Sequence, residues 1–235
     1  MIGTRMAVWV DEYDFSSAIS EVDVQMEVPE AERTSLASAA QEFRPLLPKL
    51  SVTQNGYFEG VLPDGFEAEL RSRFGVGGAV VTVLTDRLDT DCAAYVLPDA
   101  SNFEMAFATP VGGLITLNGK WGTSENARRG RRVFDGTFDA VEDGATVDFG
   151  AGVTDGGYAF LHVASITGTA TNATIEVESS ADNVSFVSEG VFTVSAVDGY
   201  VLALSGAVSR YIRLACTSVG GATAIRCMGV VSLGA

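Results

Sequence analysis

The clearest pattern in the chain is the alternation of polar and apolar residues from Ser20 to Val28. Successive side chains of a strand point to opposite faces, so this segment predicts a strand with two unlike faces. The apolar face carries Val22, Val24, Met26 and Val28. The other face is mainly acidic and carries Glu21, Asp23, Gln25 and Glu27. Pro29 is expected to end the strand, because proline cannot donate a hydrogen bond to a neighbouring strand.

One amphipathic helix is predicted at residues 64–74. Phe66, Leu70 and Phe74 recur every four residues and would form a single apolar stripe. Asp64 stands where an N-cap residue would stand. Residues 30–48, which precede this region, are predicted to be mainly a long connecting loop.

Most of the remaining chain predicts short strands between turn signals, which is typical of a β-sandwich. In the first part, strands are expected at 50–58, 79–85, 93–97, 103–109, 114–121 and 132–138. Later strands are expected at 145–149, 158–166, 173–179, 185–187, 191–194, 200–204, 211–217 and 223–231.

A change of composition at Glu142-Asp143-Gly144 predicts a domain boundary. Charged residues become sparse after it, and Ser, Thr, Gly and Val dominate. The chain has 235 residues, enough for two domains of roughly 100–150 residues. We therefore expect a mainly β protein with domains at residues 1–142 and 143–235.

The last two strands are predicted to form a hairpin around Gly221-Ala222. That register would place Cys216 opposite Cys227, where a disulfide could form. The chain has only three cysteines, and this low, odd number is not that of a secreted disulfide scaffold. Two buried thiols are therefore the favoured reading.

Charge and hydropathy exclude several classes of protein. The chain has 30 acidic and 15 basic residues and a formal charge of −15. Proteins that grip DNA use Lys and Arg to displace counterions, so this balance argues against gripping but not against letting DNA pass. The N-terminus lacks the apolar region of a signal peptide, and no run of about 18 apolar residues predicts a membrane span.

Candidate catalytic and metal-binding residues are few. His162 is the one histidine, and we expect it to be structural because no nucleophile-elbow pattern accompanies it. Asp86, Asp89 and Asp91 resemble a calcium loop but lack the EF-hand glycine and terminal glutamate, so a solvated turn is favoured. We expect no catalytic residues, no metal and no cofactor.

Two charged features have an open interpretation. The basic cluster Arg128, Arg129, Arg131 and Arg132 would contact an acidic neighbouring subunit or phosphate, or would be a solvated loop. A cleavage site is a third interpretation. The acidic face of residues 20–28 would be an ordinary polar outer face, or would hold a carboxylate pair for glycoside hydrolysis.

The order of these features resembles the tail tube proteins of long-tailed, siphovirus-type bacteriophages. The resemblance rests on the segments 19–28, 31–34, 43–52 and 55–59, the helix at 64–74 and the short strands after it, and covers about residues 1–140. Segments 178–186 and 209–214 resemble the jelly-roll sandwich attached to some of these proteins. The sequence departs from the family at Pro45-Leu46-Leu47-Pro48, where many members carry a glycine after the proline.

The resemblance implies a tail-tube β-sandwich or barrel domain with one helix, followed by a jelly-roll-like sandwich that decorates the outside. Subunits would form hexameric rings stacked into a tube, and Glu21, Asp23, Gln25 and Glu27 would face its lumen. The apolar face of this strand would pack on the rest of the sheet and on the helix. Contacts between subunits would come from Arg33, Arg44, Leu46, Leu47, Arg128, Arg129, Arg131 and Arg132.

The same resemblance implies a structural protein of the virion tail, assembled in the host cytoplasm, and not an enzyme. Its partners would be other copies of itself and the tail terminator, tape measure and tail-tip proteins. Double-stranded DNA would pass through the lumen during genome ejection without specific binding, and no membrane would be involved.

Two other functions stay open from sequence alone. A carbohydrate-binding module of a tail tip or surface protein would need exposed aromatic side chains, for which Tyr158 and Tyr200 are candidates. A hydrolase would need a carboxylate pair on the acidic strand, for which Glu21 and Asp23 are candidates.

Overall fold

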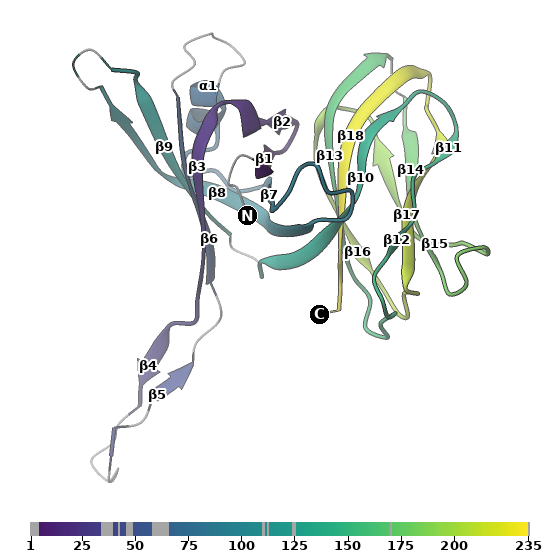
Figure 1. The fold of residues 1–235 in the computed structure, drawn as a ribbon, viewed down its shortest axis with the longest axis horizontal. Coiled ribbons are helices and arrows are strands. Elements are labelled where there is room, and N and C mark those ends of the chain that lie inside the picture. The colour runs from purple at the N-terminus through teal and green to yellow at the C-terminus, as the bar shows by residue number, and fades with distance from the viewer. Residues whose placement is uncertain are drawn as a thin grey trace. The chain divides into compact units, whose positions relative to one another are not determined.

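The computed structural model describes residues 5–33, 40–41, 43–45, 49–57, 66–109, 111, 113–123, 126–169 and 171–234. As expected, the chain is mainly β, with a single α-helix among the described residues (Figure 1). It divides into two compact units that alternate along the sequence. The first comprises Met1–Ser17, Ala79–Val96 and Arg128–Ala235, and the second comprises Ala18–Gly78 and Leu97–Ala127. No helix in the described part of the chain is long and apolar enough to cross a membrane.

The second unit is built on an antiparallel sheet with the strand order β3-β6-β9-β8. Its strands are β3 (Ile19–Glu27), β6 (Lys49–Tyr57), β9 (Thr116–Thr123) and the second half of β8 (Ala93–Ala108). The expectation that residues 30–48 are mainly a long loop is wrong, because β4 (Glu30–Glu32) pairs there with β5 (Phe43–Pro45). This two-stranded sheet follows directly from β3 and leads back into β6 (Figure 1).

The helix α1 (Phe66–Ser72) covers one face of this sheet. Phe66 and Leu70 are buried, and they lie so close to Gly56 and Gly119 that a Cβ atom there would be 2.8 Å from each side chain. The predicted apolar stripe is therefore right for these two residues. It is wrong for Phe74, which lies beyond the end of the helix and is 53% exposed. The proposed N-cap, Asp64, lies outside the described residues.

The apolar face of β3 packs only in part. Val22 and Val24 are half-buried and register with Gln54 and Val52 of β6. Met26 and Val28, in contrast, are 68% and 56% exposed, so the expectation that all four apolar residues pack inward is wrong at this end of the strand.

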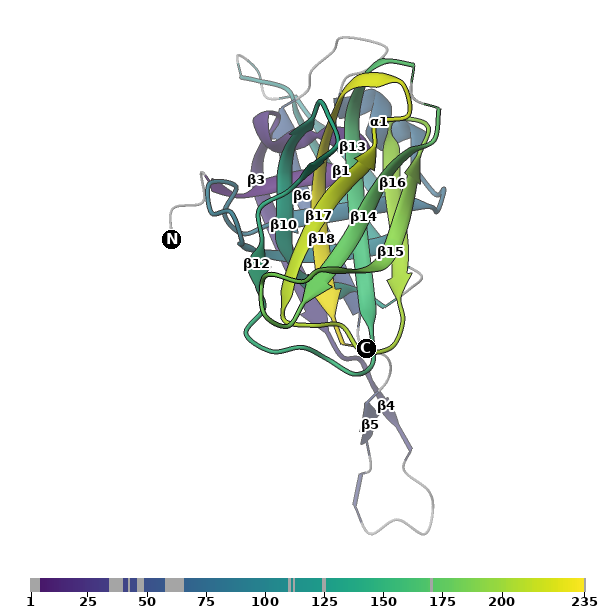
Figure 2. The same ribbon diagram turned by 90° about the vertical axis from the view of Figure 1, so that its right-hand side faces the viewer.

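The first unit contains a jelly-roll sandwich (Figure 2). One sheet has the order β16 (Asp198–Leu204), β13 (Gly157–Gly168), β18 (Ala222–Leu233) and β10 (Arg128–Phe138). The other has β15 (Val187–Val194), β14 (Ala173–Ser180) and β17 (Tyr211–Ser218), with the short β11 (Glu142–Asp143) and β12 (Val147–Asp148) both on β17. In chain order from β10 to β18, the outermost strands pair and the pairing continues inward. β10 pairs with β18, β11 and β12 pair with β17, β13 pairs with β16, and β14 pairs with β15. This nested pairing is the jelly-roll topology.

Packing groups β10 with the sandwich that follows it, although β10 precedes the boundary expected between residues 142 and 143. The division into domains 1–142 and 143–235 stays a prediction. The first sheet also continues through the start of β8 to β7 (Ala79–Leu84), β1 (Ala7–Val10) and β2 (Tyr13–Asp14).

The hairpin predicted between the last two strands is wrong. β17 and β18 lie in different sheets, and the chain crosses between them where Gly220 and Gly221 adopt positive φ angles of 59° and 94°. Cys216 and Cys227 still approach each other, but they do so across the sandwich core, where both are buried free thiols. Burial raises the pKa of both thiols, which keeps them protonated and unreactive.

Candidate functional site

The surface that stands out is the exposed face of the β3-β6-β9-β8 sheet, opposite α1; we call it the acidic face. Residues that register directly across strands share one face of a sheet. On β3 and β6 the pairs are Glu21 with Asn55, Asp23 with Thr53, Gln25 with Ser51, and Glu27 with Lys49. On β9 and β8 the face continues with Asn118, Lys120 and Glu104.

All four predicted lumen residues of β3 are exposed on this face. The acidic face carries four carboxylates (Glu21, Asp23, Glu27 and Glu104) and two lysines (Lys49 and Lys120), hence a net formal charge of −2. Each lysine registers opposite an acid: Lys49 opposite Glu27, and Lys120 opposite Glu104. None of these described positions is an arginine, and the unpaired charge is concentrated at the Glu21 and Asp23 end of β3.

The sheet has two edge strands within its own unit, and one of them, β3, is open. β3 pairs with β6 and with no other strand in the described part of the chain, so one side of a nine-residue strand lacks a partner. β8 lies at the other edge and registers with β9. Its outer side is occupied at Asn102, which forms a parallel bridge with Phe74 and exchanges backbone hydrogen bonds with Arg73 and Gly75. A long edge strand with free N–H and C=O groups is a template for pairing with another chain.

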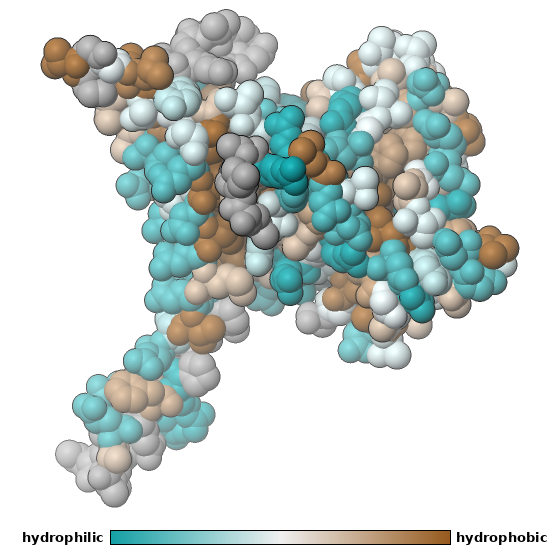
Figure 3. Space-filling model, in the orientation of Figure 1, coloured by the Kyte–Doolittle hydropathy of each residue, from teal (hydrophilic) through white to brown (hydrophobic). Residues whose placement is uncertain are grey.

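Exposed apolar side chains lie at both ends of the same sheet. Near the connection between β8 and β9, Phe107, Leu114 and Ile115 are 49%, 68% and 42% exposed. At the opposite end, where β3 leads into β4, Met26 and Val28 are exposed, and so is Phe43 of β5. Figure 3 shows brown atoms at both ends of the sheet, and also along the sheet between them. Such patches commonly mark interaction sites.

The predicted inter-subunit residues fall into two groups. Arg33 and Arg44 are exposed, next to β4 and in β5 respectively. Leu46 and Leu47 lie outside the described residues. A role for any of them in contacts between subunits stays a prediction.

The basic cluster lies on a strand, β10, and not on a solvated loop. Arg132 is buried and donates hydrogen bonds to Arg87 O and Asp135, while Arg131 pairs with Asp91. The guanidinium carbon of Arg128 lies 4.2 Å from the centre of the Tyr158 ring. Arg129 is the exposed member, and its contact with another subunit stays a prediction.

His162 is fully buried in the first unit. Its Nδ1 lies 2.8 Å from Asp11 O and its Nε2 lies 2.7 Å from Thr82 Oγ1. Nδ1–H therefore donates to the carbonyl, and Nε2 accepts from the hydroxyl. Burial lowers the pKa of His162 to about 4. A neutral ring with both nitrogens bonded and no exposed surface has the structural role expected from the sequence.

The acidic residues of the 86–91 loop are used within the chain. Asp86 accepts from the backbone of Leu88 and from Arg5, and Asp91 pairs with Arg131. Elsewhere, Asp11, Glu12 and Asp198 bring carboxylate oxygens within 4.8 Å of one another. Clustered carboxylates do not by themselves identify a metal site, and no function is assigned to this group.

The aromatic residues considered for sugar binding are not open platforms. Tyr158 is covered by Arg128. The Tyr200 hydroxyl donates to Ala196 O at 2.8 Å, and the ring packs against the sandwich core. Neither ring therefore supports the stacking role considered for it.

Comparisons with known proteins find distant likenesses in structure alone. No family model and no curated protein matches the chain. A chain from the virion of a native gene transfer agent particle is 12% identical with a TM-score of 0.40, and the match covers 54% of this chain and 96% of that one.

Two further matches come from an injection system and from a phage. A chain from the extended sheath–tube complex of an extracellular contractile injection system is 8% identical, with a TM-score of 0.41 and coverage of 55% of this chain and 90% of that one. The Dit protein of phage SPP1, described as a hub of the adsorption apparatus, is 12% identical with a TM-score of 0.30, over 97% and 98% of the two chains. Likeness at this level carries no argument about function, so the proposal below depends on the surface of the chain itself.

Proposed function

We propose that this protein is a structural subunit of a phage tail whose copies form hexameric rings that stack into a tube for double-stranded DNA. The observation that carries the proposal is one sheet with an exposed acidic face and a long open edge strand, β3. In a monomer the open edge leaves backbone groups without partners and the acidic face has no use. Together the two features suit a channel wall made from several copies.

The open edges account for ring formation. When β3 of one copy pairs with the part of the β8 edge that follows Asn102 in the next copy, the sheets join around an axis and the unpaired backbone groups of β3 are satisfied. A closed barrel has no remaining edge. The face opposite α1 then lines the interior.

The acidic face accounts for passage without adhesion. DNA binds proteins mainly through Lys and Arg that displace condensed counterions. A wall with Glu21 and Asp23 uncompensated, and with Lys49 and Lys120 each opposite an acid, offers DNA little such attraction. Repulsion between like charges acts over about 10 Å at 0.1 M salt, so it is felt by DNA that fills most of a narrow channel.

The apolar ends of the sheet account for stacking. The patch of Phe107, Leu114 and Ile115 lies at one end and that of Met26, Val28 and Phe43 at the other. Contact between two different patches is head-to-tail, and such contacts build open-ended assemblies. The proposed tube would end at the tail terminator and the tail tip and would enclose the tape measure protein.

Electron microscopy of the purified protein tests this function. The protein is concentrated and viewed in negative stain, with sedimentation velocity as a solution measurement. Rings or tubes with a central hole are expected. A protein that stays monomeric at every concentration would contradict the proposal.

A further inference from the structure

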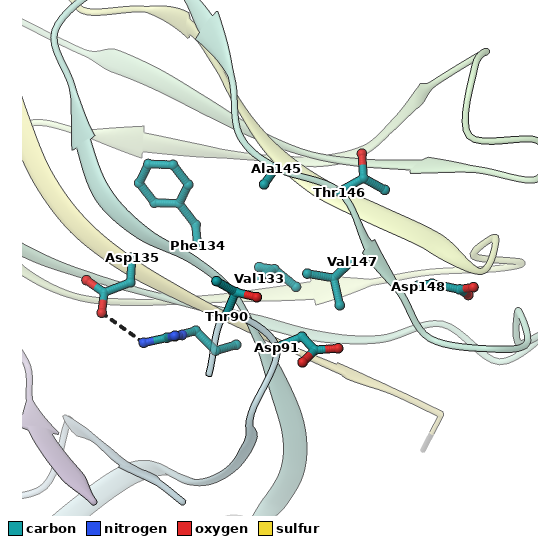
Figure 4. A pocket seen from close by; sticks show the side chains of 10 residues that line it. Thr90, Asp91, Val133, Phe134, Asp135, Ala145, Thr146, Val147 and Asp148 are labelled. Atoms are coloured by element: carbon teal, nitrogen blue, oxygen red, sulfur yellow. Dashed lines mark hydrogen bonds and ion pairs between the residues drawn. The ribbon is translucent and has the colours of Figure 1, made fainter. Parts of the chain in front are cut away.

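A second surface feature lies on the jelly-roll sandwich and has no part in the proposed tube wall. It is a pocket of about 270 Å³ beside β10 and β12 (Figure 4). Three segments line it: residues 90–91, residues 132–135 and residues 145–148. The volume lies just below the roughly 300–1,000 Å³ typical of sites for drug-sized ligands, so it suits a smaller molecule.

One wall is an aromatic ring held in place. Phe134 stacks on Phe138 with ring centroids 4.1 Å apart and an interplanar angle of 7°. Gly136 and Gly144 lie against the same ring, and a Cβ atom on Gly144 would be 2.9 Å from a ring carbon. Figure 4 shows the ring together with Ala145 and the other side chains that line the pocket. An aromatic ring of this kind attracts C–H groups to its electron-rich face.

The polar walls are three carboxylates, each of which is held by arginine. Asp91 pairs with Arg131. Asp148 accepts from Arg210 Nε at 2.9 Å, and this hydrogen bond is the main reason why the pKa of Asp148 falls to about 2. These two carboxylates are therefore fixed acceptors whose charge is matched by a neighbouring arginine.

The third carboxylate, Asp135, lies between Arg132 and Arg226. The Arg132 side chain is 5% exposed, and its Nε–H has no acceptor in the part of the chain that the structure describes. A buried donor without an acceptor is costly, and Arg132 is one of the residues that line the pocket, so a water or a ligand hydroxyl that reaches this N–H would be favoured.

The balance of charge selects the ligand. A bare cation would compete with four arginines for the carboxylates, and an anion would be repelled by the carboxylates themselves. A neutral molecule with several hydroxyl groups neither competes with the arginines nor is repelled by the carboxylates. Its hydroxyls donate charge-assisted hydrogen bonds to the fixed carboxylate oxygens. The Thr90 and Thr146 side chains, which also line the pocket, can donate and accept.

We propose that this pocket binds one ring of a neutral carbohydrate, with its C–H face on Phe134 and its hydroxyls on Asp91, Asp135 and Asp148. The proposal differs from the platform role considered for Tyr158 and Tyr200, which lie outside this pocket. It does not depend on the tube, since a chain that forms no tube can still bind sugar and the reverse also holds.

Saturation-transfer NMR tests the proposal. The full chain is mixed with millimolar methyl glycosides of glucose, galactose and N-acetylglucosamine. Ala145 is exposed and lines the pocket, so Ala145→Trp is designed to fill the pocket without removing a core contact. Ala181→Trp is the matched control, because Ala181 is an exposed alanine of the same sandwich outside the pocket.

Saturation of at least one glycoside by the natural chain and by Ala181→Trp, and its loss in Ala145→Trp, is the expected result. Phe134→Leu should also weaken the signal while keeping an apolar side chain in the wall. Absence of saturation for all three glycosides, or saturation that survives Ala145→Trp, would overturn the proposal. The amide region of each protein spectrum checks that the variants are folded.

Discussion

Asn55 donates a hydrogen bond to Glu21 across the β3–β6 pair, with its Nδ2 2.9 Å from Glu21 Oε2. The carboxylate is thereby held on the exposed face by a partner that carries no charge. At the other end of the strand, Glu27 registers opposite Lys49. The acidic face is thus organised by strand register and is not a random scatter of surface acids.

Removing this charge should change interaction with DNA but not folding. The triple variant Glu21→Gln, Asp23→Asn, Glu27→Gln alters exposed side chains, and exposed substitutions usually change stability by within about 0.5 kcal/mol each. We expect assembled protein to retain duplex DNA more strongly, with retention that weakens as salt increases. Gel mobility and filter retention at several salt concentrations measure it.

The matched control removes three exposed acids elsewhere: Asp139→Asn, Glu142→Gln and Asp155→Asn. This control has the same net charge as the triple variant and should behave like the natural chain. Equal DNA retention by the two variants would show that overall charge matters and the acidic face does not.

The apolar end of the β8–β9 connection should be needed for stacking. Leu114→Asp with Ile115→Asp places charge on side chains that are 68% and 42% exposed, so each monomer should fold normally. We expect single rings or small oligomers in place of tubes in sedimentation velocity. The control is Val184→Asp, at a residue of the other unit that is 80% exposed. If the double variant formed tubes as long as those of the natural chain, this role would be refuted.

The sequence predicts the secondary structure well where the pattern is regular. β3 and the main strands of the sandwich were expected because apolar and polar residues alternate along them. β1 was missed, because Ala7–Val10 is a fully buried run without alternation. Two strands at 93–97 and 103–109 are expected where the structure has the single strand β8, which continues through residues 98–102 with Asp99 at a φ of 48°.

Topology was harder to predict than strands. Gly220-Gly221 is a turn signal that fits either a hairpin or a crossing between sheets, and only packing decides between them. Among the candidate functional residues, those of the acidic face on β3 could be predicted from the alternation of polar and apolar positions. The pocket could not, because Asp91, Phe134 and Asp148 come together only when β10 and β12 fold against the 86–91 loop.

Packing of α1 on the sheet can be tested with two glycines. A Cβ atom at Gly56 would lie 2.7 Å from the Ala18 carbonyl oxygen and 2.8 Å from the Phe66 ring. Gly56→Ala should lower the free energy of unfolding by roughly 1–3 kcal/mol, as overpacking usually does. Gly119→Ala meets the end of the Leu70 side chain, which can move, and should cost less. Chemical denaturation measures both, and the reverse order would show that this packing is wrong.

Acid should destabilise the first unit through His162. The pKa of this buried histidine is about 4, against 6.5 for an exposed one. The unfolded chain therefore takes up a proton that the folded chain refuses, so stability is complete above pH 6.5 and is lost as the pH falls towards 4. The largest loss in the free energy of unfolding that this pKa shift can cause is about 3 kcal/mol.

The variant His162→Gln isolates this contribution. It should be less stable than the natural chain at pH 7, since hydrogen bonds to Thr82 and Asp11 change, but it should lose less stability between pH 6.5 and 4. Urea denaturation across this range measures the difference. Parallel pH profiles for the two proteins would mean that His162 becomes protonated in the folded state at an ordinary pKa.

A helical reconstruction of the assembled protein tests the central claim most directly, because it locates β3 relative to the tube axis. The account predicts a hollow tube in which Glu21, Asp23, Gln25 and Glu27 line the lumen and the β3 edge pairs with a neighbouring copy. An assembly without a central channel, or one in which these four residues face the outside, would contradict it.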